Sequence, residues 1–123
     1  MKAQSTSIAT SLAVILTSIV ISTTALADDN MLTDKAGMAL YTYDKDSTDV
    51  SNCYGRCEDK WPPYLAGANA EIKSGYGITT RKDGSKQWTY NSKPLYTWVG
   101  DSKKGIAKGD GVGNVWRTAI PTN

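Results

Sequence analysis

The chain contains no histidine and no phenylalanine, and only two of its 123 residues are cysteine. Without histidine, the commonest acid–base and metal-binding side chain is missing. A zinc or copper site would therefore lack most of its usual ligands. Basic residues are only slightly in excess, since 14 Lys and Arg are scattered among 12 Asp and Glu. Short basic runs such as Arg81-Lys82 are expected to be solvated loop residues. Nucleic-acid binding requires a basic face, so we expect no nucleic-acid partner.

The N-terminal segment, from Met1 to Ala27, has the organisation of an export signal. Lys2 is followed by an uncharged, mostly apolar stretch at residues 8–21, which leads into small residues up to Ala27. This pattern is typical of a cleavable secretory signal peptide. The stretch is shorter than the ~20 apolar residues that span a membrane, and hydroxyl residues interrupt it. We therefore predict a signal peptide at residues 1–27, cleaved after Ala27, rather than a retained membrane anchor.

Removal of the first 27 of the 123 residues leaves residues 28–123, a chain of 96 residues. That length suits a single small domain with a modest core and leaves no room for a second one. The usual lipid attachment requires a cysteine at the new N-terminus, whereas the first cysteine is Cys53. We therefore expect a periplasmic or secreted protein that is not lipid-anchored and does not insert into a membrane.

The aromatic residues are tyrosine and tryptophan only, with seven Tyr and four Trp. Because phenylalanine is absent, these rings must supply much of the core. Their polar edges also allow them to face water at a binding surface. The composition therefore leaves two roles open for them, core packing and ligand contact.

The chain contains an internal duplication. When the sequence is aligned with itself so that Leu40 falls on Leu95, six of 22 consecutive positions are identical without a gap. The identical residues are Leu40, Tyr41, Thr42, Asp46, Ser47 and Trp61 in the first half and Leu95, Tyr96, Thr97, Asp101, Ser102 and Trp116 in the second. A tripeptide can match by chance, but a tryptophan at the same spacing in both halves indicates two structural repeats. We place the repeats at about residues 31–65 and 86–120.

Each repeat is predicted to begin with a β-hairpin. In the second repeat, the β-prone residues 78–80 and 86–90 flank an Asp-Gly pair, which is a strong turn signal. The first repeat has a turn sequence at residues 34–37 between two short β-prone segments. A helical signal is confined to residues 51–60, and the connections are too short for parallel crossovers. We predict an all-β or nearly all-β fold, a small single domain of two pseudo-repeats with antiparallel hairpins.

Both repeats carry the pattern Tyr-x-aromatic-x-x-Asp, and the first also carries a cysteine pair and a Trp-Pro-Pro sequence. The residues are Tyr41, Tyr43 and Asp46, then Cys53, Cys57 and Trp61-Pro62-Pro63, and in the second repeat Tyr96, Trp98 and Asp101. This combination resembles the secreted-repeat family of predicted bacterial lipoproteins, a family of uncharacterised function, over about residues 31–120. The resemblance implies a bacterial envelope or secreted location and no particular activity. Unlike many members, this chain has no lipid-attachment cysteine.

Two roles are open to the motif aromatics. Side chains alternate along a strand, so the two aromatic residues of each motif share one face. One interpretation packs them into the core against Trp61 and Trp116, because few aliphatic residues are available for burial. The other makes them a stacking surface for a sugar ring, a planar ligand or a partner's side chain. On that second interpretation the candidate binding residues are Tyr41, Tyr43, Asp46, Tyr96, Trp98, Asp101, Trp61 and Trp116.

The motif aspartates also have alternatives. Asp46 and Asp101 stand where their strands should end, and an aspartate there can accept bonds from turn backbone or from a Tyr or Trp side chain. Asp44, Asp46 and Asp49 could instead supply oxygen ligands to calcium, although the central glycine and closing glutamate of an EF-hand loop are missing. We keep them as a weak calcium candidate and otherwise expect no metal and no cofactor.

Cys53 and Cys57 are the two cysteines, and in an exported protein such a pair usually forms a disulfide. Closing a five-residue loop contributes about 2 kcal/mol on the chain-entropy account. A redox-active pair is the alternative, but the spacing is not Cys-x-x-Cys and no βαβ pattern surrounds it. We therefore predict a structural disulfide.

Catalysis has little support, because no histidine is present and a chain of this size seldom builds a cleft for carboxylate chemistry. We expect a non-enzymatic envelope protein that binds a small ligand or an envelope protein through the aromatic and acidic motif surface. A purely structural module is the alternative, as is an accessory of periplasmic electron transfer or thiol chemistry. Exposure of the motif aromatics distinguishes the first two hypotheses.

Overall fold

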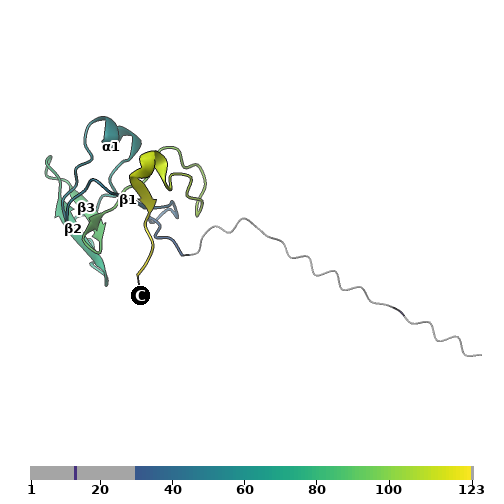
Figure 1. The fold of residues 1–123 in the computed structure, drawn as a ribbon. Helices are drawn as coiled ribbons and strands as arrows, with labels where there is room; N and C mark the ends of the chain where they lie inside the picture. Colours follow the sequence, from purple (N-terminus) through teal and green to yellow (C-terminus); the bar gives the residue numbers. More distant parts are fainter. Residues whose placement is uncertain (1–12, 14–29, 123) are drawn as a thin grey trace, which may run out of the picture.

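The computed structural model describes residue 13 and residues 30–122, and its elements are short (Figure 1). They are β1 (Tyr41–Tyr43), α1 (Arg56–Lys60), β2 (Tyr76–Thr80), β3 (Lys86–Tyr90), β4 (Lys93–Pro94), the 3-10 turn η1 (Val112–Asn114) and β5 (Trp116–Thr118). Every strand pair in the described residues is antiparallel. The prediction of a nearly all-β fold with antiparallel hairpins is therefore confirmed. Apart from residue 13, the predicted signal peptide lies outside the described residues.

Strands β2, β3 and β4 form a three-stranded sheet in the order β2-β3-β4. The turn between β2 and β3 contains Gly84, whose φ of 87° suits the Asp-Gly pair. Two residues, Asn91 and Ser92, connect β3 to β4, and both have positive φ, 48° and 65°. Positive φ at both central positions characterises the tight turn that matches the twist of a hairpin.

The first repeat begins with a smaller hairpin, as its turn sequence predicted. Thr33 bridges Ala39 in antiparallel fashion, and the Asp34 side chain closes the turn between them. Its Oδ1 accepts the backbone N–H groups of Ala36 and Met38, each at 2.9 Å. An aspartate that bonds to nearby backbone in this way is a common means of stabilising a turn.

The two repeats meet at a central antiparallel pair, Tyr41 and Tyr96. The backbone N–H of Tyr41 donates to the carbonyl of Tyr96 at 2.8 Å, and that of Tyr96 donates back at 3.0 Å. On the outer side of Tyr41 lies β5, which pairs with β1, and on the outer side of Tyr96 lies Pro63. Each repeat's closing segment therefore pairs with the other repeat's motif segment.

The hydrogen bonds around this pair are duplicated with the displacement seen in the sequence. Asp44 N–H to Val115 O corresponds to Val99 N–H to Lys60 O, and Ala119 N–H to Leu40 O corresponds to Tyr64 N–H to Leu95 O. In each case the corresponding residues are separated along the chain as Leu40 is from Leu95. The backbone hydrogen bonds therefore repeat with the same displacement as the sequence, and the two halves of the backbone are related by an approximate two-fold arrangement.

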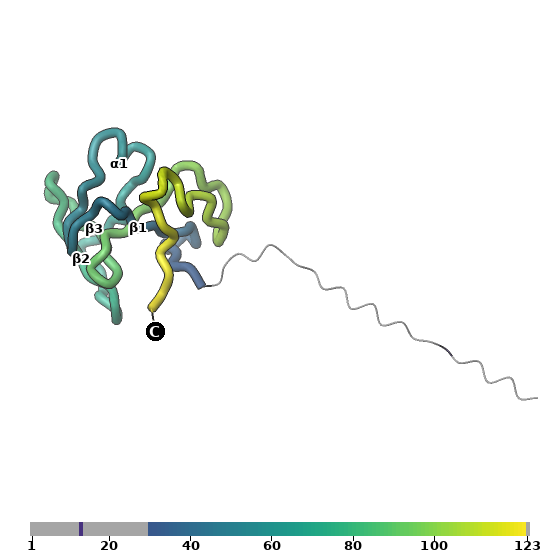
Figure 2. The backbone as a smooth tube through the Cα atoms, viewed as in Figure 1, coloured from purple at the N-terminus to yellow at the C-terminus, as the bar shows by residue number. Residues whose placement is uncertain are grey.

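Residues on opposite faces of the motif segments build two separate apolar clusters, as strand alternation predicts. One cluster contains Ala39, Tyr41, Cys53, Trp61, Tyr96 and Trp116. The other contains Leu32, Leu40, Leu95 and Ala119. In Figure 2 β1 lies between the β2–β3 hairpin and the yellow-green loop that precedes β5. No helix among the described residues has the length and apolar character needed to cross a membrane.

Candidate functional site

The motif residues of the two repeats bind each other reciprocally. The Tyr41 hydroxyl donates to Asp101 Oδ2 at 2.6 Å, and the Tyr96 hydroxyl donates to Asp46 Oδ2 at 2.7 Å. The second oxygen of each carboxylate accepts a backbone N–H from its own repeat: Asn52 to Asp46 at 2.7 Å and Lys108 to Asp101 at 2.9 Å. Each motif tyrosine is therefore locked by the aspartate of the other repeat, an arrangement we call the Tyr–Asp lock.

Both tyrosines of the lock are fully buried, with 0% of their surface exposed. Burial raises the pKa of Tyr41 well above the ordinary tyrosine range, and the hydrogen bond to Asp101 raises it further. Burial likewise raises the pKa of Tyr96 far above that range. The pKa of Asp46 is also raised by its burial, although its hydrogen bonds from Asn52 and Tyr96 act the other way. The phenols therefore remain protonated hydrogen-bond donors at neutral pH.

Four rings form a continuous stack beside this lock. Tyr43 stacks on Trp116 with ring centroids 4.4 Å apart, Trp116 on Trp61 at 3.9 Å, and Trp61 on Trp98 at 5.3 Å. The interplanar angles are 16°, 6° and 18°. Trp61 and Trp116 are buried, whereas Tyr43 and Trp98 at the two ends are half-buried. We call this four-ring set the aromatic stack.

A different set of aromatic residues lines an open groove of about 810 Å³. Tyr64, Tyr76 and Trp88 form its aromatic wall, and all three are half-buried. The ring centroids of Tyr64 and Trp88 are 6.4 Å apart, and those of Tyr76 and Trp88 are 5.9 Å apart. The remaining lining residues are Thr33, Asp34, Lys35, Ala36, Leu65, Gly67, Asn69, Ala70, Glu71 and Lys73.

Strand β3 places its aromatic residues on the outer face and its polar residues on the inner one. Gln87 and Thr89 are buried, at 0% and 1% exposed, whereas Trp88 and Tyr90 between and beside them are half-buried. The usual pattern of a sheet with one solvated face is the reverse. The Gln87 amide is satisfied in the interior, because its nitrogen donates to the Leu95 carbonyl at 2.8 Å. This reversed pattern turns Trp88 outward, where it contributes to the aromatic wall.

Comparison with known families identifies both halves of the duplication. A family described as a secreted repeat of unknown function matches residues 22–64 and again residues 77–119, more than half of the chain. The two matches are displaced from each other by the same amount as the paired backbone hydrogen bonds. The chain belongs to this secreted-repeat family. No match was found among curated proteins or among solved structures.

The secreted-repeat motif mostly fills the core of this member. Tyr41 and Tyr96 are fully buried, and Trp61 and Trp116 are each 4% exposed, so a ligand cannot stack on them. For these four residues the structure therefore shows the core-packing interpretation and not the stacking surface. The remaining candidates, Tyr43, Asp46, Trp98 and Asp101, are half-buried. Tyr43 and Asp46 border a smaller hollow of about 300 Å³.

The weak calcium candidate does not assemble. Asp44 forms an ion pair with Arg117 at 3.1 Å, and both oxygens of Asp46 already accept hydrogen bonds. The described residues contain no group of three or more acidic, cysteine or histidine side chains that could hold a metal ion. Asp44 and Asp46 therefore have separate partners within the fold.

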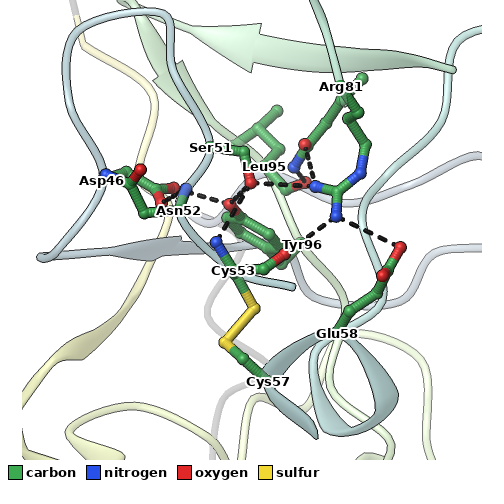
Figure 3. Close-up of a disulfide and its surroundings, with 10 residues drawn as sticks. Asp46, Ser51, Asn52, Cys53, Cys57, Glu58, Arg81, Leu95 and Tyr96 are labelled. Carbon is green, nitrogen blue, oxygen red and sulfur yellow. Dashed lines mark hydrogen bonds and ion pairs between the residues drawn. A yellow bond between two sulfur atoms is a disulfide. The ribbon is translucent and has the colours of Figure 1, made fainter. Parts of the chain in front are cut away.

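Cys53 and Cys57 form the predicted disulfide, and a buried arginine holds their loop (Figure 3). Arg81 is 2% exposed, so its interpretation as a solvated loop residue was wrong. Its guanidinium donates to Ser51 Oγ at 2.9 Å, Gln87 Oε1 at 2.7 Å and the Cys53 carbonyl at 2.8 Å. It also pairs with Glu58 at 3.2 Å. Several acceptors thus compensate for burying this charge.

The groove residues were not among the sites predicted from the sequence. The sequence contains one signal that could have found them, the alternation of Gln87, Trp88, Thr89 and Tyr90 along a predicted strand. Alternation separates aromatic from polar residues into two faces, but it does not say which face is buried. Tyr64 comes from another segment, the end of the first repeat, and is brought to Trp88 by tertiary pairing: the N–H of Trp88 donates to the Tyr64 carbonyl at 2.8 Å.

Proposed function

We propose that this protein is a non-catalytic secreted protein, free of a lipid anchor, that binds a small neutral ligand in the groove lined by Tyr64, Tyr76 and Trp88. The observation that carries the proposal is the row of three half-buried rings along a hollow of about 810 Å³. That volume lies within the range of ordinary small-molecule sites. The family's description as secreted supports export.

The aromatic wall favours a ligand with flat apolar faces. Tyrosine and tryptophan offer large rigid surfaces with a polar edge, which suit a ring that is apolar on one face and rich in hydroxyl groups at its rim. Burial raises the pKa of Tyr64, and the nearby negative charge of Asp34 raises it further. Its phenol is therefore a neutral hydrogen-bond donor and acceptor at neutral pH.

The charged residues of the groove favour a neutral ligand. Asp34 and Glu71 are balanced by Lys35 and Lys73, so the lining has no excess of either sign. Together with Asn69, these side chains supply donors and acceptors around the aromatic wall. A sugar ring combines the required flat face, hydroxyl rim and lack of charge, and we propose a neutral oligosaccharide as the ligand class.

The proposal is tested by titrating the protein with neutral oligosaccharides, maltoheptaose and chitohexaose first, in a calorimeter. We expect at least one to bind with a dissociation constant in about the micromolar to millimolar range. Replacing Trp88 by Leu removes the central ring of the wall and is expected to weaken binding at least about tenfold, a loss of about 1.4 kcal/mol.

The matched control is Trp98→Leu, which removes another half-buried tryptophan at the end of the aromatic stack. We expect this variant to bind as the original protein does, because Trp98 does not line the groove. If none of the neutral probes binds, or if binding survives Trp88→Leu, the groove is not a sugar site. Equal losses in both variants would indicate a general loss of structure instead.

A further inference from the structure

We propose that the aromatic stack, Tyr43–Trp116–Trp61–Trp98, carries oxidising equivalents through the protein, with Tyr41 and Tyr96 as the residues that are finally oxidised. This role is independent of the groove and of its ligand. It concerns one-electron chemistry, in which a ring loses an electron and a neighbouring ring replaces it.

The geometry of the stack suits electron exchange between neighbouring rings. Electronic coupling falls steeply with distance, so it is strongest between rings that are parallel and in contact. Each adjacent pair here has ring centroids 3.9–5.3 Å apart and planes within 18° of parallel. The innermost pair, Trp61 and Trp116, is the closest and the most nearly parallel.

The ends and the interior of the stack differ in their access to a reagent. Tyr43 and Trp98 are half-buried and can be approached from solution, whereas Trp61 and Trp116 are 4% exposed. The stack therefore connects two accessible rings through two inaccessible ones. Because a bulky oxidant cannot contact the inner rings, oxidation products at Trp61 or Trp116 would require electron transfer from these rings to an accessible one.

The Tyr–Asp lock supplies proton acceptors at the inner rings. Tyr41 meets Trp61 edge-on at 5.2 Å, and Tyr96 meets Trp116 edge-on at 5.2 Å. The Tyr41 hydroxyl hydrogen bonds to Asp101 at 2.6 Å, and the Tyr96 hydroxyl to Asp46 at 2.7 Å. A phenol loses an electron more readily when its proton can leave in the same event, and each carboxylate stands ready to accept that proton.

At the Trp98 end, the electron transfer begins at the accessible ring and ends at Tyr41. A one-electron oxidant outside the protein, such as an oxidised metal complex, takes an electron from Trp98 and is itself reduced. Trp61 then donates an electron to the oxidised Trp98. Tyr41 donates an electron to the oxidised Trp61 while its phenolic proton passes to Asp101 Oδ2. A neutral tyrosyl radical and a protonated Asp101 remain. An electron from a one-electron reductant such as ascorbate then passes back through Trp98 and Trp61 to Tyr41, and the proton returns from Asp101.

The test oxidises the folded secreted protein with photogenerated tris(bipyridine)ruthenium(III), which is too bulky to enter the core, and maps the oxidised residues by peptide mass spectrometry. We expect oxidation products at Trp61, Trp116, Tyr41 and Tyr96 despite their burial. The double variant Tyr43→Leu with Trp98→Leu removes both accessible ends and is expected to lower the yield of these core products severalfold.

The matched control is Trp88→Leu, which removes a half-buried tryptophan from the separate groove cluster. It is expected to leave the yield of core products unchanged or higher, because one competing target has been removed. Oxidation confined to exposed rings in the original protein would overturn the proposal. A core yield that the double variant leaves unchanged, or raises while the fold is intact by circular dichroism, would overturn it as well.

A second variant tests the proton acceptor without altering the stack. Asp101→Asn keeps the size of the side chain but removes the carboxylate that takes the Tyr41 proton. We expect the oxidation products to shift severalfold from Tyr41 towards Trp61, while Tyr96 with its own acceptor is unaffected. An unchanged share at Tyr41 would show that the Tyr–Asp lock takes no part in the transfer.

Discussion

The two repeats build the same Tyr–Asp lock with different loops. In the first repeat, residues 51–60 include the disulfide and α1, and Ser51 Oγ lies 2.6 Å from the Tyr96 hydroxyl. In the second repeat the corresponding segment is glycine-rich, and the backbone N–H of Gly109 donates to the Tyr41 hydroxyl at 3.0 Å. The lock depends on a tyrosine, an aspartate and a further polar group beside the phenol.

The comparison shows which part of each repeat is constrained. Ser51 accepts a hydrogen bond from Arg81, a residue distant in the sequence that also donates to the Cys53 carbonyl. The Tyr96–Asp46 pair, which we call the first lock, therefore relies on the disulfide and on a buried charge for support. The Tyr41–Asp101 pair, the second lock, relies on close backbone packing. A Cβ atom at Gly109 would lie 2.8 Å from the Trp61 ring and 3.0 Å from the Tyr41 ring. Repeats can thus diverge in their loops while keeping the motif.

Gly109→Ala is expected to have the largest effect on stability, and it acts on the loop of the second repeat. The added methyl group would press on two rings of the packed core, and we expect a loss of about 3 kcal/mol, the upper end of the usual range for overpacking. The measurement is the free energy of unfolding in urea. Gly67→Ala is the control, because nothing lies within 4 Å of a Cβ atom there. Equal effects at both glycines would mean that the core rearranges around Gly109 without cost.

Removing the disulfide tests the support of the first lock. Replacing Cys53 and Cys57 together by serine is expected to lower the free energy of unfolding by about 2 kcal/mol, the loop-closure contribution of a five-residue loop. Hydrogen exchange should then increase at residues 51–60 and much less around Gly109, because the disulfide joins two residues of the first loop. An increase spread evenly over both loops would contradict separate support of the two locks.

The phenolic hydrogen bonds are tested by Tyr96→Phe and Tyr41→Phe. Each variant removes a bond to a carboxylate, and we expect a loss of about 1.5 kcal/mol, at the low end for such bonds because each aspartate keeps a backbone donor. Tyr43→Phe is the control, since its hydroxyl makes no hydrogen bond to the described residues. A loss at Tyr43 as large as at the lock tyrosines would assign the effect to ring packing.

Much of the architecture could be predicted from local sequence signals. The turns at residues 34–37 and at the Asp-Gly pair, the short helix within residues 51–60 and the disulfide all depend on neighbours in the chain. The match of Leu40-Tyr41-Thr42 with Leu95-Tyr96-Thr97 also predicted two repeats, although their exact bounds remain a prediction. These features need little knowledge of which distant segments meet.

Features that depend on distant pairing could not be predicted in the same way. The motif spacing suggests that an aspartate caps its own repeat, and only the Tyr41–Tyr96 pairing brings Asp101 to Tyr41. Arg81 is buried because its acceptors come from separate segments, which a short basic run does not reveal. Trp88 faces outward because Gln87 finds partners inside, an outcome that strand alternation leaves open.

Alkaline pH provides the mildest test of the two locks. The pKa values of Tyr41 and Tyr96 are raised in the folded protein, so the unfolded chain loses these protons first as the pH passes the ordinary tyrosine value of about 10. Their contribution is therefore intact below that pH and declines above it, by at most about 1.4 kcal/mol per pH unit for each tyrosine. Urea unfolding measured from neutral pH to above the ordinary tyrosine value of about 10 checks the sign. Tyr96→Phe should make the decline shallower, and an equally steep decline in that variant would assign it to other groups.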